Sequence, residues 1–437
     1  MARLRNAPRH RHGVKVALLS ALVVPMSLLG ACGNDDGGSD GKVTLRFSWW
    51  GSDTRHAMTQ KLIDLYQSKN PNVKIQPEYT DWNGYWDRMA TSVAGGNAPD
   101  VMQQETKYVR EYADRGALLD LTSQLQRTIK AADLDPLVKD AGAIDGKTYA
   151  IPTGVNALAL VASPSGFEAA KVGLPDDSSW TWDDYVKVAT DVTKGSPKGS
   201  YGTQNMGYSD ASLEVFARQR GESTFTGTGM GVSKQTLVDW WTISEKLRKE
   251  GGEPPASLSV ETQASGLDGS LIGTGKGAMG FWWTNELPAI SEALGKEVKL
   301  LRVPGEAAAS TPGMFLKPAM FWSISSKTKH PEEAAKFVDF LLNDPAAAEI
   351  ILSDRGLPVN LTARKAIVSK LTPADQLSAQ FMDSVREKVA PPPALPPKGA
   401  GEVQKILQQI NEQVLFAKLT PEQAADEFLK QAAAAIG

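Results

Sequence analysis

The sequence predicts an α/β fold built in two parts, and three observations support this. Residues 43–104 alternate strand-like and helix-like segments in the order β-α-β-α-β, the pattern of a parallel sheet covered by helices. At 437 residues, the chain is too long for a single hydrophobic core. Two strand-like segments also meet end to end within residues 145–161, separated by Pro152 and Gly154, with no room for a tight hairpin. This is how a chain leaves one part of a fold and enters another.

Residues 1–31 have the pattern of an export signal peptide. Basic residues precede the apolar segment 16–29, and no acidic residue is present. The apolar segment is too short to span a bilayer with ordinary flanks, and it ends in small residues. Cys32 follows directly and is the only cysteine of the chain, so no disulfide can form within it. Residues 33–41, rich in Gly and Asp, read as a flexible tether.

Composition excludes several classes of function. The formal net charge is −3, and it becomes more negative once the basic leader is removed, which argues against nucleic acid as a partner. Two of the four histidines lie in the leader, and His56 and His330 both fall at expected helix starts. No His-Glu-x-x-His, Gly-x-Ser-x-Gly or cysteine cluster is present. We therefore expect no metal centre and no cofactor.

The first part is expected to form a parallel sheet. Its predicted elements are a strand at 43–50, a helix capped by Asp53 and ended by Asn70-Pro71, a strand at 73–76, a helix at 82–93 and a strand from Asp100. The carboxyl ends of parallel strands meet at one edge of a sheet, where ligands bind. Adjacent strand residues point to opposite faces, so at least one of Trp49 and Trp50 should face this edge.

The second part contains another tryptophan pair at a strand end. Residues 278–283 form the expected strand, which closes with Trp282-Trp283 and is followed by Asn285 and Glu286. Residues 201–208 read as a glycine-punctuated loop, and residues 315–324 as a strand carrying Trp322. Further elements are a helix opened by His330-Pro331, a stiff proline-rich loop at 391–397 and a helical end from residue 401.

Two glycine motifs resemble nucleotide-binding patterns but lack their context. Gly142 to Thr148 is one residue short of a P-loop, and a strand-like segment rather than a helix follows it. Gly275 to Gly280 fits Gly-x-Gly-x-x-Gly, but it precedes a strand instead of opening a helix. Neither motif predicts a bound nucleotide.

The 11 tryptophans and the polar residues at strand ends indicate a carbohydrate cleft. Sugar rings stack their C–H patches on indole faces, and their hydroxyls need donors and acceptors around the rim. Two alternatives stay open. A glycoside hydrolase or lyase would pair carboxylates among Asp53, Glu105 and Glu286 across the cleft. A binding protein for polyols or amino acids would use Asp53 and Arg55 to hold charged ends.

The chain resembles extracellular solute-binding protein family 1, the substrate-binding lipoproteins of carbohydrate ABC transporters of the maltodextrin and multiple-sugar type. The resemblance runs in order along the chain and is carried by the lipobox-like residues 29–32 and by residues 70–75, 98–101, 146–152, 275–279 and 329–335. It implies a two-lobed periplasmic-binding-protein-like fold with an interlobe ligand cleft. It also implies a hinge of about three crossing segments, placed here near 153–156, 319–322 and 357–360.

The resemblance also implies domain boundaries, location and partners. The N-terminal lobe would comprise 43–154 and 320–356, and the C-terminal lobe 155–319 and 357–437. Lipid on Cys32 would anchor the chain to the outer face of the cell membrane through a tether at 32–42. The monomeric receptor would close on a mono- or oligosaccharide, without catalysis, and deliver it to an ABC permease.

The expected ligand contacts come from both lobes. Tryptophans would stack on the sugar or wall the site: Trp49, Trp50, Trp82, Trp86, Trp282, Trp283 and Trp322. Met89 and Val93 share the helical face of Trp86, a pattern that also fits a core position. Polar side chains would hydrogen-bond it: Asp53, Arg55, Glu105, Asn156, Asn285, Glu286 and Arg355. Asn156 matches a position just after the first crossing where this family often has a polar contact.

Overall fold

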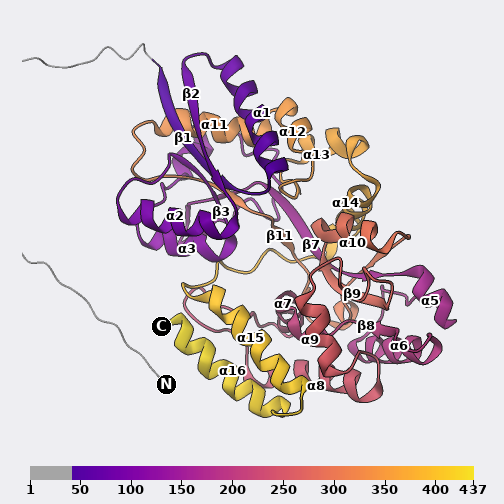
Figure 1. Ribbon diagram of the computed structural model, residues 1–437. Helices are drawn as coiled ribbons and strands as arrows, with labels where there is room; N and C mark the ends of the chain where they lie inside the picture. Colours follow the sequence, from indigo (N-terminus) through magenta and orange to yellow (C-terminus); the bar gives the residue numbers. More distant parts are fainter. Residues whose placement is uncertain (1–41) are drawn as a thin grey trace, which may run out of the picture. The chain divides into compact units, whose positions relative to one another are not determined.

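The computed structural model describes residues 42–437. The predicted signal peptide, Cys32 and nearly all of the predicted tether lie outside these residues. Two sheets organise residues 42–437, each with helices on both sides (Figure 1). The mixed α/β class expected from the sequence is therefore confirmed. Among residues 42–437, none of the helices combines the length and hydropathy needed to cross a bilayer.

The first sheet has five strands. Their spatial order is β2 (Val73–Thr80), β1 (Val43–Trp50), β3 (Val101–Gln104), β12 (Phe321–Ile324) and β6 (Ile151–Pro152). The first three strands are parallel, as the β-α-β-α-β order predicts, and β12 runs antiparallel to β3. The strands β12 and β6, which come later in the sequence, therefore extend the sheet beyond β3.

Helices cover both faces of the first sheet. Leu45, Phe47 and Trp49 of β1 pack against α1 (Asp53–Lys69), α11 (Pro331–Asn343) and α12 (Pro345–Ile351). Trp50 and Met102 pack on the other face against α2 (Trp82–Ala94) and α3 (Thr106–Asp114). The strand pleat separates Trp49 from Trp50, but each enters its own core layer. Asp53 occupies the first turn of α1 and Ser52 the N-cap position, so the predicted cap is one residue too late.

The second sheet has six strands centred on the long strand β7 (Gly154–Ala162), all nine residues of which are buried. The other strands are β10 (Lys299–Leu301), β9 (Gly277–Trp283), β8 (Tyr201–Thr203), β11 (Leu316–Pro318) and β13 (Leu357–Pro358). Residues 201–208, expected to be a loop, hold β8 and the 3₁₀ helix η1 (Met206–Tyr208). The three-residue length of β8 leaves almost no periodicity to detect.

Helices also cover both faces of the second sheet. Leu160 packs in one cluster with α5 (Pro164–Ala170), α6 (Trp182–Gly195), α7 (Asp210–Arg218), α8 (Lys234–Glu250), α15 (Ala400–Leu415) and α16 (Pro421–Ile436). Val161 faces the opposite cluster with α10 (Leu287–Leu294). Trp240 and Trp241 of α8 are fully buried.

The remaining elements complete the described chain. They are α4 (Thr122–Arg127), the hairpin of β4 (Ala143–Ile144) and β5 (Lys147–Thr148), α9 (Ala256–Ala264), η2 (Thr284–Glu286), η3 (Glu306–Ala308), α13 (Leu361–Ile367), η4 (Val368–Lys370), α14 (Pro373–Val385) and η5 (Arg386–Lys388).

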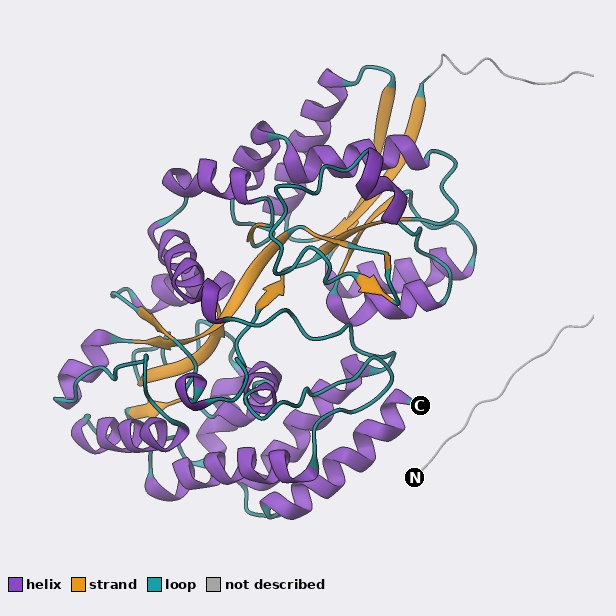
Figure 2. Cartoon of the chain, turned by 180° about the vertical axis from the view of Figure 1, so that it is seen from behind, coloured by secondary structure: helices purple, strands orange, loops and turns teal. Residues whose placement is uncertain are grey.

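Three chain crossings join the two sheets. The first is Thr153 between β6 and β7, the second Ala319–Met320 between β11 and β12, and the third leads into β13. Thr153 binds the other two crossings: its N–H and hydroxyl donate to the Met320 carbonyl at 3.0 and 3.3 Å, and its hydroxyl lies 3.1 Å from the Arg355 carbonyl. We call this junction the hinge. Strands pass from one group of helices to the other through it (Figure 2).

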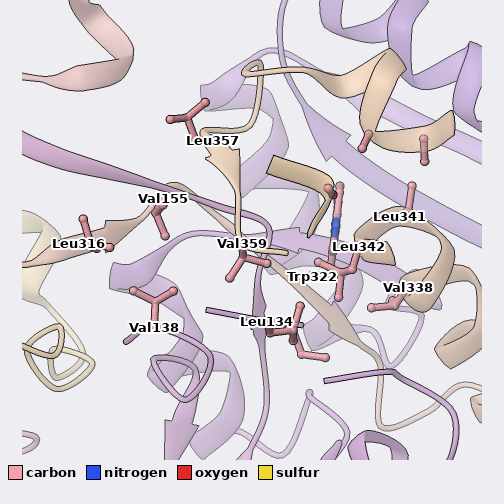
Figure 3. Packing of buried hydrophobic residues seen from close by; sticks show 14 of the residues in the cluster. Leu134, Val138, Val155, Leu316, Trp322, Val338, Leu341, Leu342, Leu357 and Val359 are labelled. Atoms are coloured by element: carbon pink, nitrogen blue, oxygen red, sulfur yellow. The ribbon is translucent and has the colours of Figure 1, made fainter. Parts of the chain in front are cut away.

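The hydrophobic core continues through the hinge. Val155, Leu316 and Leu357 come from the three crossing strands and lie together, with Val359 beside them and Trp322 beyond (Figure 3). All five side chains are at most 3% exposed. The crossings are therefore packed against one another, which limits the motion available to the hinge.

Candidate functional site

A cavity of about 250 Å³ lies between the carboxyl end of β3 and the strands β9 and β11 of the second sheet. We call it the main cavity. We call each sheet with the helices that cover it a half of the protein. The cavity wall combines charged and aromatic side chains from both halves: Glu105, Lys107, Asp210, Trp283, Phe315 and Lys317. Parallel strands place ligand sites at their carboxyl ends, and β3 follows this rule.

Glu105 and Lys107 reach the main cavity from the start of α3. Glu105 is the N-cap of this helix and accepts a hydrogen bond from the Lys107 N–H at 2.9 Å. Its carboxylate lies 3.7 Å from the ammonium of Lys317 on β11. The cap therefore fixes a carboxylate at the point where the two sheets face each other.

Trp283 ends β9 and supplies the aromatic wall. The ammonium of Lys317 lies 5.2 Å from the centre of its ring, and the Phe315 ring meets it edge-on at 6.2 Å. Glu286 accepts the Trp283 N–H at 2.8 Å, which holds the turn after the strand. Burial raises the pKa of Glu286, although the hydrogen bond from Trp283 and the charge of Lys317 oppose this shift.

Asp210, at the start of α7, joins the two halves through Gln404 of α15. The Gln404 amide donates to Asp210 at 3.3 Å, and Lys107 donates to the Gln404 carbonyl oxygen at 3.3 Å. The Asp210 side chain is exposed to solvent in the cavity. The surrounding protein atoms still remove part of the hydration of its carboxylate, which raises its pKa. Lys107 and Lys317 act against this shift.

A proline-rich segment, residues 391–397, closes one side of the main cavity. Its Leu395 carbonyl accepts from Arg110 of α3 at 3.2 Å, and its Pro391 carbonyl accepts from Arg218 of α7 at 2.7 Å. The Leu395 side chain is 3% exposed and packs with Tyr112 of the first half. The stiff loop expected from the prolines therefore bridges both halves at the cavity.

A smaller pocket of about 160 Å³ adjoins the main cavity and shares Asp210, Trp283 and Gln404 with it. We call it the side pocket. Its wall includes η1, the end of β9 and the inner face of α15. Of the residues predicted from the sequence, Trp282, Trp283 and Glu286 line it.

The remaining predicted tryptophans lie away from both pockets. Trp49 and Trp322 are 0 and 1% exposed in the core of the first half. Trp50, Trp82 and Trp86 pack on one another with ring centres 5.0–5.5 Å apart, on the face of the sheet covered by α2 and α3. Trp86 is buried beside Met89, as its shared helical face suggested, while Trp82 is 38% exposed.

The remaining predicted polar residues are also outside the cavity wall. Arg355 is 1% exposed and donates to Thr59 at 2.8 Å and to Gln103 at 3.3 Å. Arg55 pairs with Asp354 at 2.8 Å. Asp53 and Asn285 are exposed, and Asn156 is buried on β7 opposite Lys317 of β11. We do not include these residues in the site.

The main contributors that sequence reasoning missed are Lys107, Asp210, Lys317 and Gln404. Lys317 follows the aromatic Phe315 within a segment read as one strand, and β11 ends just beyond it at Pro318. A break predicted there would have drawn attention to its position. Gln404 lies four residues before Gln408 on α15, and both face the side pocket. No local sequence pattern identified Lys107 or Asp210 as site residues.

Among residues 42–437, no group of three or more His, Cys, Asp or Glu side chains could hold a metal ion. The arrangement instead offers hydrogen-bond donors, acceptors and an indole face. Such a site can bind and orient a polar, ring-shaped molecule.

The chain matches known solute-binding proteins over most of its length. The family model of bacterial extracellular solute-binding proteins matches residues 61–377. A lipoprotein of Streptomyces antibioticus is 27% identical over 87% of this chain and 87% of its own length. The diacetylchitobiose-binding protein DasA of Streptomyces coelicolor is 23% identical over 75% of this chain and 76% of its own.

A solved structure agrees. A family 1 extracellular solute-binding protein from Alicyclobacillus acidocaldarius is 28% identical, with a TM-score of 0.74 over 91% of this chain and 99% of that one. The two sheets, the hinge and the family match lead to one conclusion: this chain belongs to the bacterial extracellular solute-binding protein family.

Proposed function

We propose that the protein is a non-enzymatic sugar receptor that closes on its ligand at the main cavity. The observation that carries this proposal is the half-buried Trp283 face, surrounded by Glu105, Lys107, Asp210 and Lys317 from both halves. An indole face takes the C–H patches of a sugar ring, and charged side chains around it bind its hydroxyls. The diacetylchitobiose-binding relative supports the same ligand class.

Unpaired polar atoms in the main cavity favour a hydroxyl-rich ligand. The hydroxyls of Thr106 and Thr224 are buried in its wall and have no hydrogen-bond partner in the described part of the chain. A buried hydroxyl without a partner costs about 1–3 kcal/mol, so a ligand that satisfies both gains affinity and selectivity. An apolar ligand would leave that cost in place.

Closure about the hinge is the proposed motion. In this proposal the first lobe comprises 43–154 and 320–356, and the second lobe comprises 155–319 and 357–437. Because cavity residues come from both lobes, a change in their separation would make or break the site. Closure would also give an ABC permease a way to recognise the loaded receptor.

We also propose that lipid on Cys32 anchors a monomeric receptor to the outer face of the cell membrane. The lipobox-like sequence at 29–32 and the lipoprotein relative support this. A Cys32→Ala chain expressed in a bacterial host should move from the membrane fraction to the soluble exported fraction. Retention in the membrane would contradict the anchor.

The direct test of ligand class is a thermal-shift screen of residues 42–437 against monosaccharides, oligosaccharides, polyols and amino acids. A ligand that binds only the folded state raises stability by about 2.7 kcal/mol at one hundred times Kd. We expect a shift with a sugar that persists on long incubation. A shift that decays as the sugar is cleaved would indicate the glycoside hydrolase alternative. A response only to polyols or amino acids would overturn the carbohydrate assignment.

A further inference from the structure

We propose that the side pocket is a second sugar subsite that accepts an uncharged ring, so that the preferred ligand has at least two rings. This inference rests on the proposed function and extends it from ligand class to ligand length and charge. Three independent features of the side pocket carry it: its position, its unpaired polar atoms and the charges of its wall.

The position of the side pocket makes it continuous with the main cavity. Trp283, Asp210 and Gln404 line both, so a molecule in one touches the wall of the other. The main cavity has the larger volume, about 250 Å³ against about 160 Å³. A chain of linked rings passing Trp283 would occupy both spaces, whereas a single ring would fill only one.

Three buried polar atoms in the side pocket have no hydrogen-bond partner among residues 42–437. They are the carbonyl oxygen of Gln204, the hydroxyl of Tyr208 and the indole N–H of Trp282. Tyr208 is 6% exposed, so its hydroxyl has little access to bulk water. An acceptor, a hydroxyl and a donor together match a sugar ring, whose hydroxyls both donate and accept. Filling these bonds recovers the cost of burying the three groups unpaired.

A buried network behind the wall keeps the side pocket in shape. Asn205 donates to both carboxyl oxygens of Glu253, at 3.0 and 2.9 Å, and to Ser244 at 2.9 Å. Asn411 of α15 donates to the Asn205 carbonyl oxygen at 2.9 Å. This network ties η1 to α8 and α15, so the pocket wall is rigid before ligand arrives.

Charge separates the side pocket from the main cavity. The main cavity is lined by Lys107 and Lys317 together with the acidic Glu105, Asp210 and Glu214, whereas the described wall of the side pocket contains Asp210 and Glu286 and no Lys, Arg or His. A sugar carboxylate placed there would lose water and face two acidic groups, while the cations that act on these groups, Lys107 and Lys317, lie in the wall of the main cavity. A neutral ring bears neither cost. The geometry therefore selects against an acidic sugar at this end of the ligand.

The test is calorimetric titration of residues 42–437 with maltose, cellobiose, N,N′-diacetylchitobiose, digalacturonic acid and their monosaccharides. We expect a neutral disaccharide to bind best, at least tenfold more tightly than its own monosaccharide. Gln408→Leu, which removes an amide from the pocket wall, should lower that disaccharide's affinity by at least tenfold. Gln409→Leu changes the exposed neighbour on α15, outside both pockets, and should have no effect.

Each contrary result has a distinct meaning. Gln263→Leu removes another wall amide on a different helix, α9, and covers the case in which the first variant fails to fold. Equal affinity for monosaccharide and disaccharide, tightest binding of digalacturonic acid, or unchanged affinity in folded wall variants would overturn the subsite while leaving a sugar receptor in place. Binding of none of these carbohydrates would overturn the proposed function itself, and the subsite with it.

Discussion

Lys317 places its ammonium 3.7 Å from the Glu105 carboxylate and 5.2 Å from the centre of the Trp283 ring. Glu105 directly follows β3 of the first sheet, whereas Lys317 and Trp283 belong to the second. One side chain therefore brings together the two halves, an opposite charge and the aromatic wall. A sugar stacked on Trp283 would lie within reach of both charged groups.

Replacing Lys317 with Met should reduce sugar affinity about tenfold or more. A hydrogen bond to a charged group contributes about 1.5–3 kcal/mol, and the variant removes this donor from the cavity. Stability should change by less than about 1 kcal/mol, because the ion pair with Glu105 is partly open to solvent. Calorimetric titration and thermal denaturation of the same preparation measure the two effects.

Lys187→Met provides a matched control. Lys187 pairs with Asp191 at 2.6 Å on α6, outside both pockets, and its side chain is 74% exposed. This variant should bind sugar like the wild type. If Lys317→Met lost stability but kept its affinity, the Glu105 pair would be a structural tie rather than part of the site.

Gly154→Ala should destabilise the protein by about 1–3 kcal/mol or more. A Cβ at Gly154 would collide with the carbonyl oxygens of Arg355 and Gly356, because the first and third crossings are in close contact there. Gly173 has no neighbour within 4 Å of the same position, so Gly173→Ala should leave stability almost unchanged. Urea denaturation of both variants tests the packing of the hinge. If Gly154→Ala were as stable as Gly173→Ala, the first and third crossings would not be held in the close contact described here.

Glu253→Gln should flatten the dependence of stability on pH. Burial raises the pKa of Glu253 from 4.5 to about 8, although Asn205 and Arg248 oppose the shift. Between these values the folded protein keeps a proton that the unfolded chain has lost. The free energy of unfolding therefore falls as pH rises from about 4.5 to about 8, with a slope of at most about 1.4 kcal/mol per pH unit from this group.

The uncharged amide removes this contribution, so the variant should gain stability relative to wild type as pH rises. Glu250→Gln changes an exposed carboxylate at the last residue of α8, three positions before Glu253, and should keep the wild-type profile. Denaturant titrations at several pH values decide the matter. Parallel profiles for the wild type and Glu253→Gln would mean that this carboxyl is already ionised at neutral pH.

The sequence was most informative where structure depends on local pattern. Alternating residues located β1, and Pro152 and Gly154 located the first crossing, because these signals act over a few positions. The pleat argument correctly separated Trp49 from Trp50. It could not show that helices cover both faces of the sheet, so it did not reveal that each tryptophan enters a core.

The cavity wall depends on contacts that no local pattern records. Lys107 and Gln404 are 297 positions apart, and Asp210 and Gln404 are 194 apart. Only the folding of α15 against η1 and the return of the proline-rich segment bring them together. Trp283 and Glu286 were found because they follow a recognisable strand end. Arg355 has a charged, hydrogen-bond-donating side chain of the kind that contacts ligands, but it is buried and donates to Thr59 and Gln103 instead.

The most direct test of the sugar-binding cavity is Trp283→Ala, assayed with the sugar that gives the largest thermal shift. Trp283 is half-buried and lines both pockets, so its loss should reduce affinity more than tenfold while the Tm of the unliganded protein barely moves. Trp241→Ala, at a fully buried position beside Phe428, should show the opposite behaviour and lose about 3–5 kcal/mol of stability. Intact affinity with a large fall in Tm for Trp283→Ala would assign this side chain to the core and contradict the site.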